Sequence, residues 1–325
     1  MKKAVLLLVV LMAMSAAAEA VILLQVHLDR TRLAAMLLSL SLTLCAFVGL
    51  SQSSLLRYLR QRAVESVWAA TGLPLFLLIP YLVYAFGTGS FSFPGVGKLL
   101  AYIVVPTLLL LPDRLHRPAH LGWRDVVAMV ALGLPVAANW LRGIWTWPFD
   151  LYFFRPLFCV CAGMYAFAVV RNLEGVGYRL LWRKQDVADG VANFLAFCLF
   201  GIPLGMALRF VHPHFSSASS GQLPLQFFSI YLTTAIPEEL LFRGFLQNLL
   251  CRSIRRGPTG VYGLLIAAVI FGASHLHHAP VPNWRYAILA TLAGMFYGYT
   301  YRNRQRISAS ALTHALVDTA WHFWF

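Results

Sequence analysis

Long apolar segments with almost no charged residues recur along the whole chain and constrain its fold more than any other feature. Lys, Arg, Asp and Glu together make up 12% of the 325 residues, whereas hydrophobic residues make up 59%. Soluble domains carry about 25% charged residues, so this chain cannot build a water-soluble surface. Segments of roughly 20 apolar residues are long enough to cross a bilayer as helices. The sequence therefore predicts an all-α, polytopic integral membrane protein and excludes an ordinary soluble enzyme, a DNA-binding domain and a disordered chain.

About eleven segments have the length and apolarity of a membrane span. Their predicted bounds are 4–25, 33–50, 64–87, 96–112, 125–141, 151–170, 187–211, 225–250, 258–278, 284–301 and 307–325. The first is ambiguous, because Lys2, Lys3, an apolar run and the small residues at 15–18 are also typical of a secretory signal. Apolar residues resume at 20–24, which favours a retained helix.

The basic residues between the predicted spans alternate in number from one side of the membrane to the other. One set of loops holds 18 of the 26 Lys and Arg residues, and the opposite set holds six. Because cytoplasmic loops retain positive charge, this pattern predicts a multi-pass protein of the cell (inner) membrane with a cytoplasmic N-terminus and an outer C-terminus. The net charge of +14 is thus a topology signal, and we expect the lipid bilayer and no nucleic acid as a partner.

The longest polar connection covers 212–222, and we divide the chain there. Residues 1–212 are predicted to form a multi-span N-terminal region, and 213–325 the membrane core that carries the site. The five Cys residues lie mostly in apolar segments without a CxxC pair, so we predict neither a disulfide framework nor a zinc ribbon. Arg155 lies inside a predicted span, and we expect it to pair with Asp150 or to extend towards the membrane surface.

The acidic residues locate the candidate site by elimination. Nine of the 12 Asp and Glu residues lie in or beside predicted loops, at the start of a span, or in the first segment. The three that remain within spans are Glu238, Glu239 and Asp318. A carboxylate at membrane depth costs about 2.5–3.5 kcal/mol on insertion scales, so its presence indicates a function.

Glu238 and Glu239 directly follow Pro237, which predicts that both lie in the first turn of a helical segment. Glu239 and Arg243 are four residues apart and therefore share a helix face, within pairing distance. Glu238 lies about 100° further round the helix and is left to face another group.

Two later segments bring histidines into the membrane. His275 follows Phe271 by one helical turn, and His314 precedes Asp318 by one turn. Buried polar groups in lipid must find one another, so we expect the three segments to meet. A Glu beside a His can take a proton from water, and a second His can donate to an oxyanion. The set favours hydrolysis of an amide bond, and the sequence holds no GxSxG or GxGxxG motif that would indicate serine or dinucleotide chemistry.

Three ordered motifs resemble the CPBP family of intramembrane proteases, which includes the type II CAAX prenyl endopeptidases and bacteriocin-processing and immunity relatives. They read EELLFR at 238–243, FGASH at 271–275 and HALVD at 314–318, and the resemblance covers about 220–325. It implies a helical membrane fold with a water-accessible polar cavity. It also implies a glutamic-type protease in which a glutamate activates the attacking water, and we expect no cofactor.

The resemblance assigns a role to each matched residue. Glu238 would be the base that activates water, His275 its partner on that water, and His314 would stabilise the oxyanion together with position 318. The implied catalytic set is Glu238, His275, His314 and Asp318. The implied supporting set is Glu239, Arg243 and Phe271.

The chain departs from the family pattern at Asp318, where Asn is usual. An ionised Asp would repel an oxyanion, so Asp318 is either protonated or mainly orients His314. A Glu with two His also matches a ligand number that zinc accepts, so a zinc-dependent variant stays open although the sequence holds no HExxH motif.

The loop charges place Glu238 and His275 towards the outer half of the membrane. A membrane-anchored peptide or protein, or a C-terminal tail, is therefore the expected substrate, cleaved near the outer leaflet. Two other functions stay open, namely a non-catalytic immunity or scaffold protein and a transporter that uses the acids and histidines as a proton relay. The ionisable groups are confined to the last third of the chain without paired broken helices, which favours the protease over the transporter.

Overall fold

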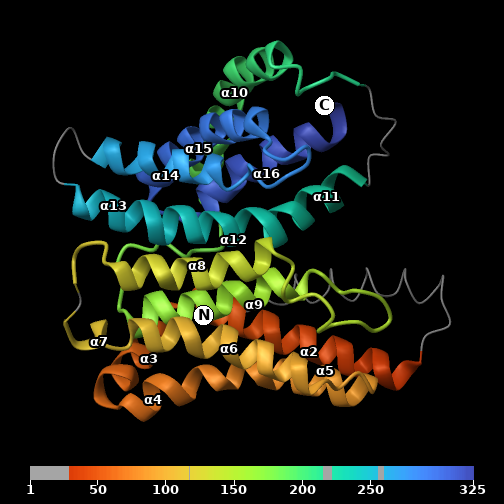
Figure 1. Cartoon of the computed structure of the whole chain (residues 1–325), viewed down its shortest axis with the longest axis vertical. Coiled ribbons are helices and arrows are strands. Elements are labelled where there is room, and N and C mark those ends of the chain that lie inside the picture. The colour runs from red at the N-terminus through yellow and green to blue at the C-terminus, as the bar shows by residue number, and fades with distance from the viewer. Residues whose placement is uncertain (1–28, 117, 215–221, 255–259) are drawn as a thin grey trace. The chain divides into compact units, whose positions relative to one another are not determined.

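The computed structural model describes residues 29–116, 118–214, 222–254 and 260–325. Every regular element in these ranges is helical and none is a strand, which confirms the predicted all-α class. The first predicted span, 4–25, lies outside them. The chain divides into two compact units, and the main division falls between Glu174 and Gly175 (Figure 1). The predicted boundary at 212 concerns function and stays a prediction.

The first unit is a helical bundle in which α2 packs against α5 and α9, and α6 packs against α8. Its helices are α2 (Arg30–Gly49), α3 (Ser53–Glu65), α4 (Val67–Gly72), η1 (Leu73–Leu77), α5 (Leu78–Thr88), α6 (Phe93–Leu110), α7 (Asp113–His116), α8 (Trp123–Ala137), α9 (Phe154–Gly163) and η2 (Met164–Val170). Aromatic rings fill part of its core, where Trp145 stacks on Phe154 at 5.5 Å and meets Tyr81 edge-on at 6.0 Å.

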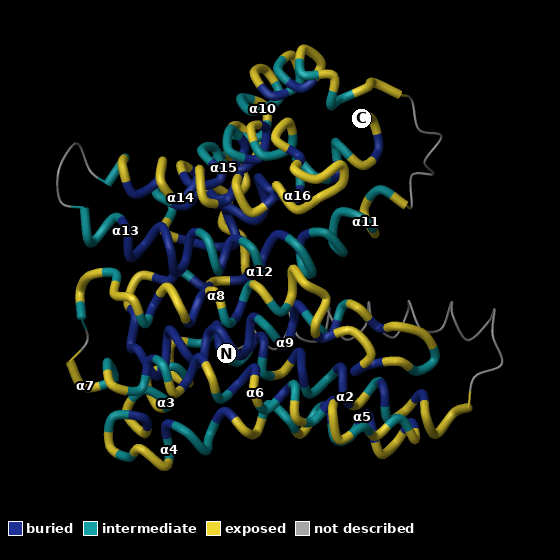
Figure 2. The backbone as a smooth tube through the Cα atoms, viewed as in Figure 1, coloured by how far each residue is buried: buried dark blue, intermediate teal, exposed yellow. Residues whose placement is uncertain are grey.

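The second unit is built around α15, which packs against α10, α14 and α16. Its helices are α10 (Lys184–Ala207), α11 (Gln222–Ile230), η3 (Tyr231–Ala235), α12 (Ile236–Glu239), η4 (Leu240–Gln247), α13 (Asn248–Ser253), α14 (Val261–Ala273), α15 (Trp284–Arg304) and α16 (Ile307–Trp324). Long buried stretches in η4 and in the first half of α16 form the centre of this unit (Figure 2).

Each predicted span after the first coincides with a helix or with a run of consecutive helices. Four of these are long and apolar enough to cross a membrane, namely Arg30–Gly49, Val67–Thr88, Phe93–Leu110 and Lys184–Ala207. Two shorter apolar helices cover Phe154–Val170 and Val261–Ala273. Helix length and composition therefore support a membrane protein with four candidate spans in the described residues, and the total of eleven stays a prediction.

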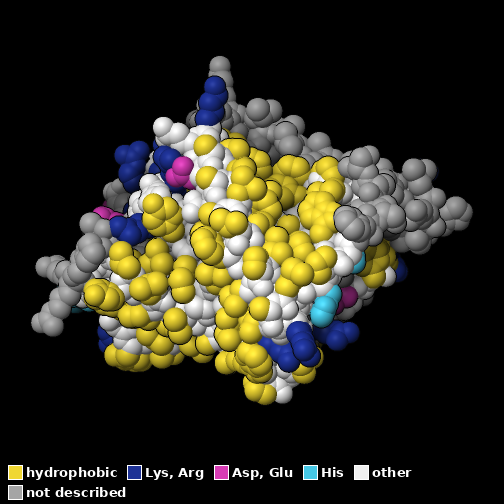
Figure 3. Space-filling model, turned by 90° about the horizontal axis from the view of Figure 1, so that it is seen from above, with side chains coloured by type: hydrophobic (Ala, Val, Ile, Leu, Met, Phe, Trp, Pro, Cys, Tyr) yellow, Lys and Arg dark blue, Asp and Glu magenta, His cyan; other side chains and the backbone are white. Residues whose placement is uncertain are grey.

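Apolar side chains cover much of the surface that Figure 3 shows. In α10, the large side chains of Leu195, Leu199 and Phe200 are exposed. Extended apolar patches on a protein surface mark contact with a membrane or a partner. The exposed face of α10 is therefore suited to lipid.

Two acids that the sequence assigned to loops are instead buried in ion pairs. Asp125, in the first turn of α8, lies 2.5 Å from Arg171, and both side chains are almost fully buried. Asp186, in the first turn of α10, lies 2.8 Å from Arg306 and accepts a hydrogen bond from the backbone N–H of Arg183. A helix N-terminus favours an anion because its first N–H groups lack partners within the helix. Both acids lie beside loops as predicted, but their position in the sequence did not show that they are buried.

Arg155 lies in the first turn of α9 and pairs with Asp150. Its side chain is largely buried, whereas that of Asp150 is exposed. The pairing alternative is thus confirmed for Arg155, and the residue is no part of the site described below.

Candidate active site

The two adjacent glutamates lie in the middle of a helix that runs without a break from Gln222 to Ser253. Pro237 and both glutamates do lie in the first turn of a short helical segment, α12, as predicted, but this segment continues a helical run that starts well before Pro237. Proline lacks an N–H and its ring clashes with the carbonyl of the residue four positions back, and the π-helical stretch η3 before it supplies a wider turn. Glu238 and Glu239 therefore sit in α12 between two π-helical stretches, η3 and η4.

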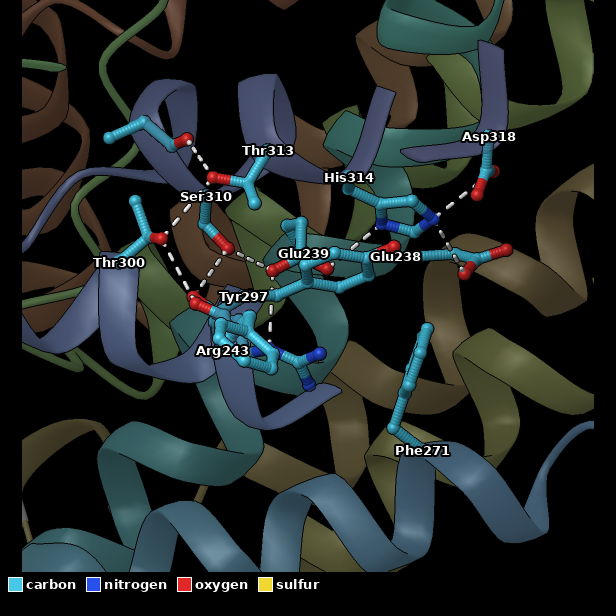
Figure 4. A network of polar contacts seen from close by, with 12 residues as sticks. Glu238, Glu239, Arg243, Phe271, Tyr297, Thr300, Ser310, Thr313, His314 and Asp318 are labelled. Carbon is cyan, nitrogen blue, oxygen red and sulfur yellow. Dashed lines mark hydrogen bonds and ion pairs between the residues drawn. The ribbon is translucent and has the colours of Figure 1, made fainter. Parts of the chain in front are cut away.

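Glu239 is the centre of a buried polar network (Figure 4). Its side chain is fully buried, and one carboxylate oxygen lies 3.2 Å from Nε of Arg243. The same carboxylate accepts hydrogen bonds from the Ser310 hydroxyl and, at 3.0 Å, from Nδ1 of His314. A buried carboxylate is costly unless it is paired and hydrogen-bonded, and these contacts meet that condition. The predicted Glu239–Arg243 contact is present.

Arg243 is held by charge and by aromatic faces. Its guanidinium carbon lies 4.7 Å from the centre of the Phe271 ring and 5.8 Å from that of Tyr297. Nη1 and Nη2 have no hydrogen-bond acceptor among the described residues. The contact with Glu239 is a charge contact rather than an aligned hydrogen bond, since Nε meets the distance of an ion pair but has no hydrogen-bond partner. Cation–π contacts add to the attraction that keeps this cation buried.

His314 lies between three carboxylates. Nδ1 faces Glu239, while Nε2 lies 3.3 Å from an oxygen of Asp318 and 3.9 Å from an oxygen of Glu238. Nδ1 is hydrogen-bonded to Glu239, whereas Nε2 meets Asp318 and Glu238 at ion-pair distances, and carboxylates on both sides of the ring favour a charged imidazolium. Its ring stacks on that of Tyr297 at 4.5 Å and 14°, which fixes the ring plane.

Glu238 opens into a cavity of about 230 Å³ within the second unit. Its side chain is 36% exposed, in contrast to the fully buried Glu239. The polar end of the cavity is lined by Glu238, His275, His314 and Asp318. The remaining wall is mostly apolar and includes Phe194, Phe197, Ile202, Leu289, Val317 and Trp321. The four residues of the predicted catalytic set thus reach one cavity, although they come from segments up to 80 residues apart.

His275 does not contact Glu238 directly, although the motif implies that the two residues act on the same water. Its Nδ1 donates to the carbonyl of Phe271 at 2.8 Å, so in the neutral ring Nε2 is an acceptor. The ring packs edge-on against Phe271 at 4.8 Å and against Tyr286 at 4.6 Å. Among the described residues no hydrogen bond or ion pair joins His275 to Glu238, and His314 is the histidine that lies nearest in the ion-pair geometry. The two residues share the cavity, so a bound water could join them.

Asp318 lies one turn after His314 on α16 and is partly exposed in the cavity. Its contact with Nε2 of His314 can hold the imidazole ring in a fixed orientation. A carboxylate that accepts from an imidazolium has no donor of its own to offer. The sequence left open whether Asp318 is protonated or mainly orients His314. The geometry favours the second role, in which Asp318 orients His314.

Several residues of the site were missed from the sequence. The Ser310 hydroxyl binds Glu239 and lies 3.0 Å from the carbonyl oxygen of Tyr297, so its one proton is shared between two acceptors. Tyr286 and Tyr297 line the cavity from α15. Ser310 carries a usable signal, because it precedes His314 by four residues and shares its helix face. The tyrosines carry none, since an aromatic residue in an apolar helix is more often part of the core.

The described residues contain no group of three or more His, Cys, Asp and Glu side chains arranged to hold a metal ion. His314 would have to give up its contact with Glu239 or with Asp318 before either nitrogen could bind a metal.

Comparison with known protein families gives one match. Residues 220–320 match the family model of the Rce1-like type II CAAX prenyl endopeptidases. No curated protein and no solved structure matches the chain. The matched range contains all three motifs and every residue of the predicted catalytic and supporting sets. Residues 220–320 are thus an Rce1-like domain of the type II CAAX prenyl endopeptidase family, which confirms the resemblance to CPBP proteases.

Proposed function

We propose that this protein is an intramembrane endopeptidase that hydrolyses a peptide bond by means of a glutamate-activated water. One observation carries the proposal. Glu238 opens into a cavity beside His314, whose two ring nitrogens are held by Glu239 and Asp318. A free carboxylate next to a fixed imidazolium combines a base with an electrophile, and amide hydrolysis needs both.

The reaction starts with a water between Glu238 and the scissile amide. Glu238 takes a proton from this water, and the water oxygen forms a bond to the carbonyl carbon. The carbonyl oxygen becomes negative and is stabilised by the charge of His314. The C–N bond then breaks, and Glu238 returns its proton to the nitrogen that leaves as an amine. His275 lines the same cavity, and its Nε2, an acceptor in the neutral ring, helps to orient the water.

The supporting residues hold this arrangement in place. Glu239 fixes Nδ1 of His314, and Arg243 neutralises Glu239 while it packs on Phe271. Rigid support of this kind keeps reacting groups within a narrow range of geometry, which is a large part of catalysis.

The substrate that we propose is a membrane-associated peptide or protein. The apolar wall of the cavity suits a substrate segment that arrives from lipid, and the exposed apolar face of α10 is next to that wall. The loop charges favour a site in the outer half of an inner membrane, with an outer C-terminus. A membrane-anchored peptide or C-terminal tail therefore fits better than a cytosolic prenylated protein.

The test uses the purified full chain in liposomes with two quenched fluorescent peptides. One carries a prenylated CAAX end, and the other carries a single apolar span with a short polar tail. Cleavage of the spanning peptide is expected, and Glu238→Gln should abolish it because the amide cannot take a proton from water. Glu65→Gln, an exposed carboxylate of α3, is the matched control and should cleave normally.

Two results would contradict the proposal. Full activity of Glu238→Gln in a folded, inserted protein would show that Glu238 is not the base. No cleavage of either peptide by the unmodified protein would favour a non-catalytic membrane protein. Preference for the prenylated peptide would correct the substrate class alone.

A further inference from the structure

The polar end of the cavity has few hydrogen-bond donors left for a substrate. Both N–H groups of His314 point at carboxylates, and Nδ1–H of His275 is bound to the Phe271 carbonyl. Asp318 lies 3.3 Å from Nε2 of His314 as an ion-pair partner, and an ionised carboxylate has no proton to donate. An oxyanion would thus meet the charge of His314 without an N–H group reserved for it, although such donors are a large part of amide hydrolysis.

The hydroxyl of Tyr286 is placed to fill this gap. Tyr286 lines the cavity from the first turn of α15, and its hydroxyl makes no hydrogen bond to the described residues. It lines the same cavity as Glu238 and Asp318, and its ring packs against that of His275, so it lies beside the residues of the proposed chemistry. A half-buried phenol that is not bound to protein can donate to a ligand.

The ring of Tyr286 is fixed by aromatic neighbours on several sides. Its centre lies 4.6 Å from that of His275, 5.0 Å from Trp321 and 5.4 Å from Phe210. These contacts come from three separate segments of the second unit. The hydroxyl therefore has a defined position before substrate binds, which is the condition for electrostatic stabilisation without reorganisation.

Other donors at the cavity are less well placed. Tyr297 also lines the cavity, but its ring is almost fully buried and stacks on that of His314. Thr234 also lines the cavity, but its short side chain is not fixed by comparable packing.

We propose that Tyr286 is a further catalytic residue, whose hydroxyl donates a hydrogen bond to the carbonyl oxygen of the scissile amide as that oxygen gains negative charge. The phenol keeps its proton throughout, and no bond to Tyr286 forms or breaks. This inference rests on the proposed function. The hydroxyl of Tyr286 supplies the hydrogen-bond donor that the carboxylate of Asp318 does not offer.

The first test removes the hydroxyl and keeps the ring. Tyr286→Phe should lower kcat about 10²–10³-fold, the usual cost of one lost oxyanion donor, with KM changed less than about threefold because the donor acts mainly in the transition state. The assay uses the full chain in liposomes and the probe peptide that the unmodified protein cleaves faster. Tyr299→Phe, an exposed tyrosine on the same helix, should keep the original kcat.

The second test is a rescue that a structural role could not produce. An Asn side chain at position 318 brings its own N–H donor, so Asp318→Asn combined with Tyr286→Phe should be at least about tenfold more active than Tyr286→Phe alone. Unchanged kcat in Tyr286→Phe, or a loss without rescue, would overturn the role of Tyr286. A loss in Thr234→Val with normal Tyr286→Phe would assign the donor elsewhere. Whatever the Tyr286 variants show, an inactive Glu238→Gln is consistent with the proposed protease. An active Glu238→Gln would contradict the proposed protease mechanism, and the role of Tyr286 with it.

Discussion

At the scale of single residues, Glu238 and Glu239 show how two identical, adjacent side chains can have different roles. A step of one helical position turns a side chain by about 100°. Glu239 points into the protein and binds Arg243, Ser310 and His314, while Glu238 opens into the cavity. A carboxylate that is saturated with donors is a poor base, so the two residues are not interchangeable in the proposed reaction.

Glu239→Gln should destabilise the protein more than any change at Glu238. The substitution leaves Arg243 buried without an anion, and loss of one partner of a buried pair costs about 3–5 kcal/mol. We expect a clear fall in Tm, measured by intrinsic fluorescence in detergent micelles. Glu65→Gln breaks an exposed contact with Arg62 and should leave Tm where it is. An equal Tm in both variants would show that the network around Glu239 does not stabilise the fold.

Metal removal is a further prediction at the residue scale. Both nitrogens of His314 already face carboxylates, so we expect 1,10-phenanthroline and EDTA to leave peptide cleavage unchanged. The measurement is the cleavage rate of the purified protein before and after dialysis against chelator. Inactivation that added zinc reverses would replace the glutamate mechanism with a zinc-dependent one.

At the scale of elements, α10 forms one wall of the cavity, and ion pairs hold its N-terminal end in place. Asp186 in its first turn pairs with Arg306, which directly precedes α16, and Asp189 pairs with Arg304 at the end of α15. Further along, Phe194, Phe197 and Ile202 face the cavity. The outer side of the same helix is apolar and exposed, whereas its inner side packs against α15 and α16.

Asp186→Asn should therefore loosen α10. The variant keeps a side-chain oxygen for the N–H of Arg183 but leaves Arg306 without its buried anion, which costs about 3 kcal/mol. We expect a lower Tm and faster proteolysis near the start of α10. Asp189→Asn, which breaks a more exposed pair, is the control and should have a smaller effect. A reversed order of the two variants would contradict this reading of α10.

At the scale of the whole molecule, the orientation predicted from the loop charges can be tested on α15, a predicted span that is not among the four candidate spans of the described residues. α15 has 21 residues and is therefore about 31 Å long, which matches the apolar thickness of a bilayer. Arg285 lies near its first residue and Arg302 near its last. The predicted orientation places Arg285 outside and Arg302 in the cytoplasm.

We expect a membrane-impermeant maleimide to label Arg285→Cys, but not Arg302→Cys, in intact cells. Both substitutions are made in a chain whose five native cysteines have been replaced. Labelling of both positions after lysis is the control for reactivity. Labelling of Arg302→Cys alone in intact cells would reverse the orientation and move the proposed cleavage to the inner leaflet.

The sequence by itself determined the helical membrane class, the positions of the helices and the identity of the residues that meet at the cavity. Those properties depend on apolar length, on helical spacing and on residue types that lipid tolerates only for a reason. It could not show that the helix passes through Pro237, that Asp125 and Asp186 are buried, or that His314 rather than His275 lies beside Glu238. Nor could it find Tyr286, whose type and spacing are those of an ordinary core residue. Only the tertiary structure decided these points, because each depends on which groups from distant segments come within a few ångströms and compete for the same hydrogen bonds and charges.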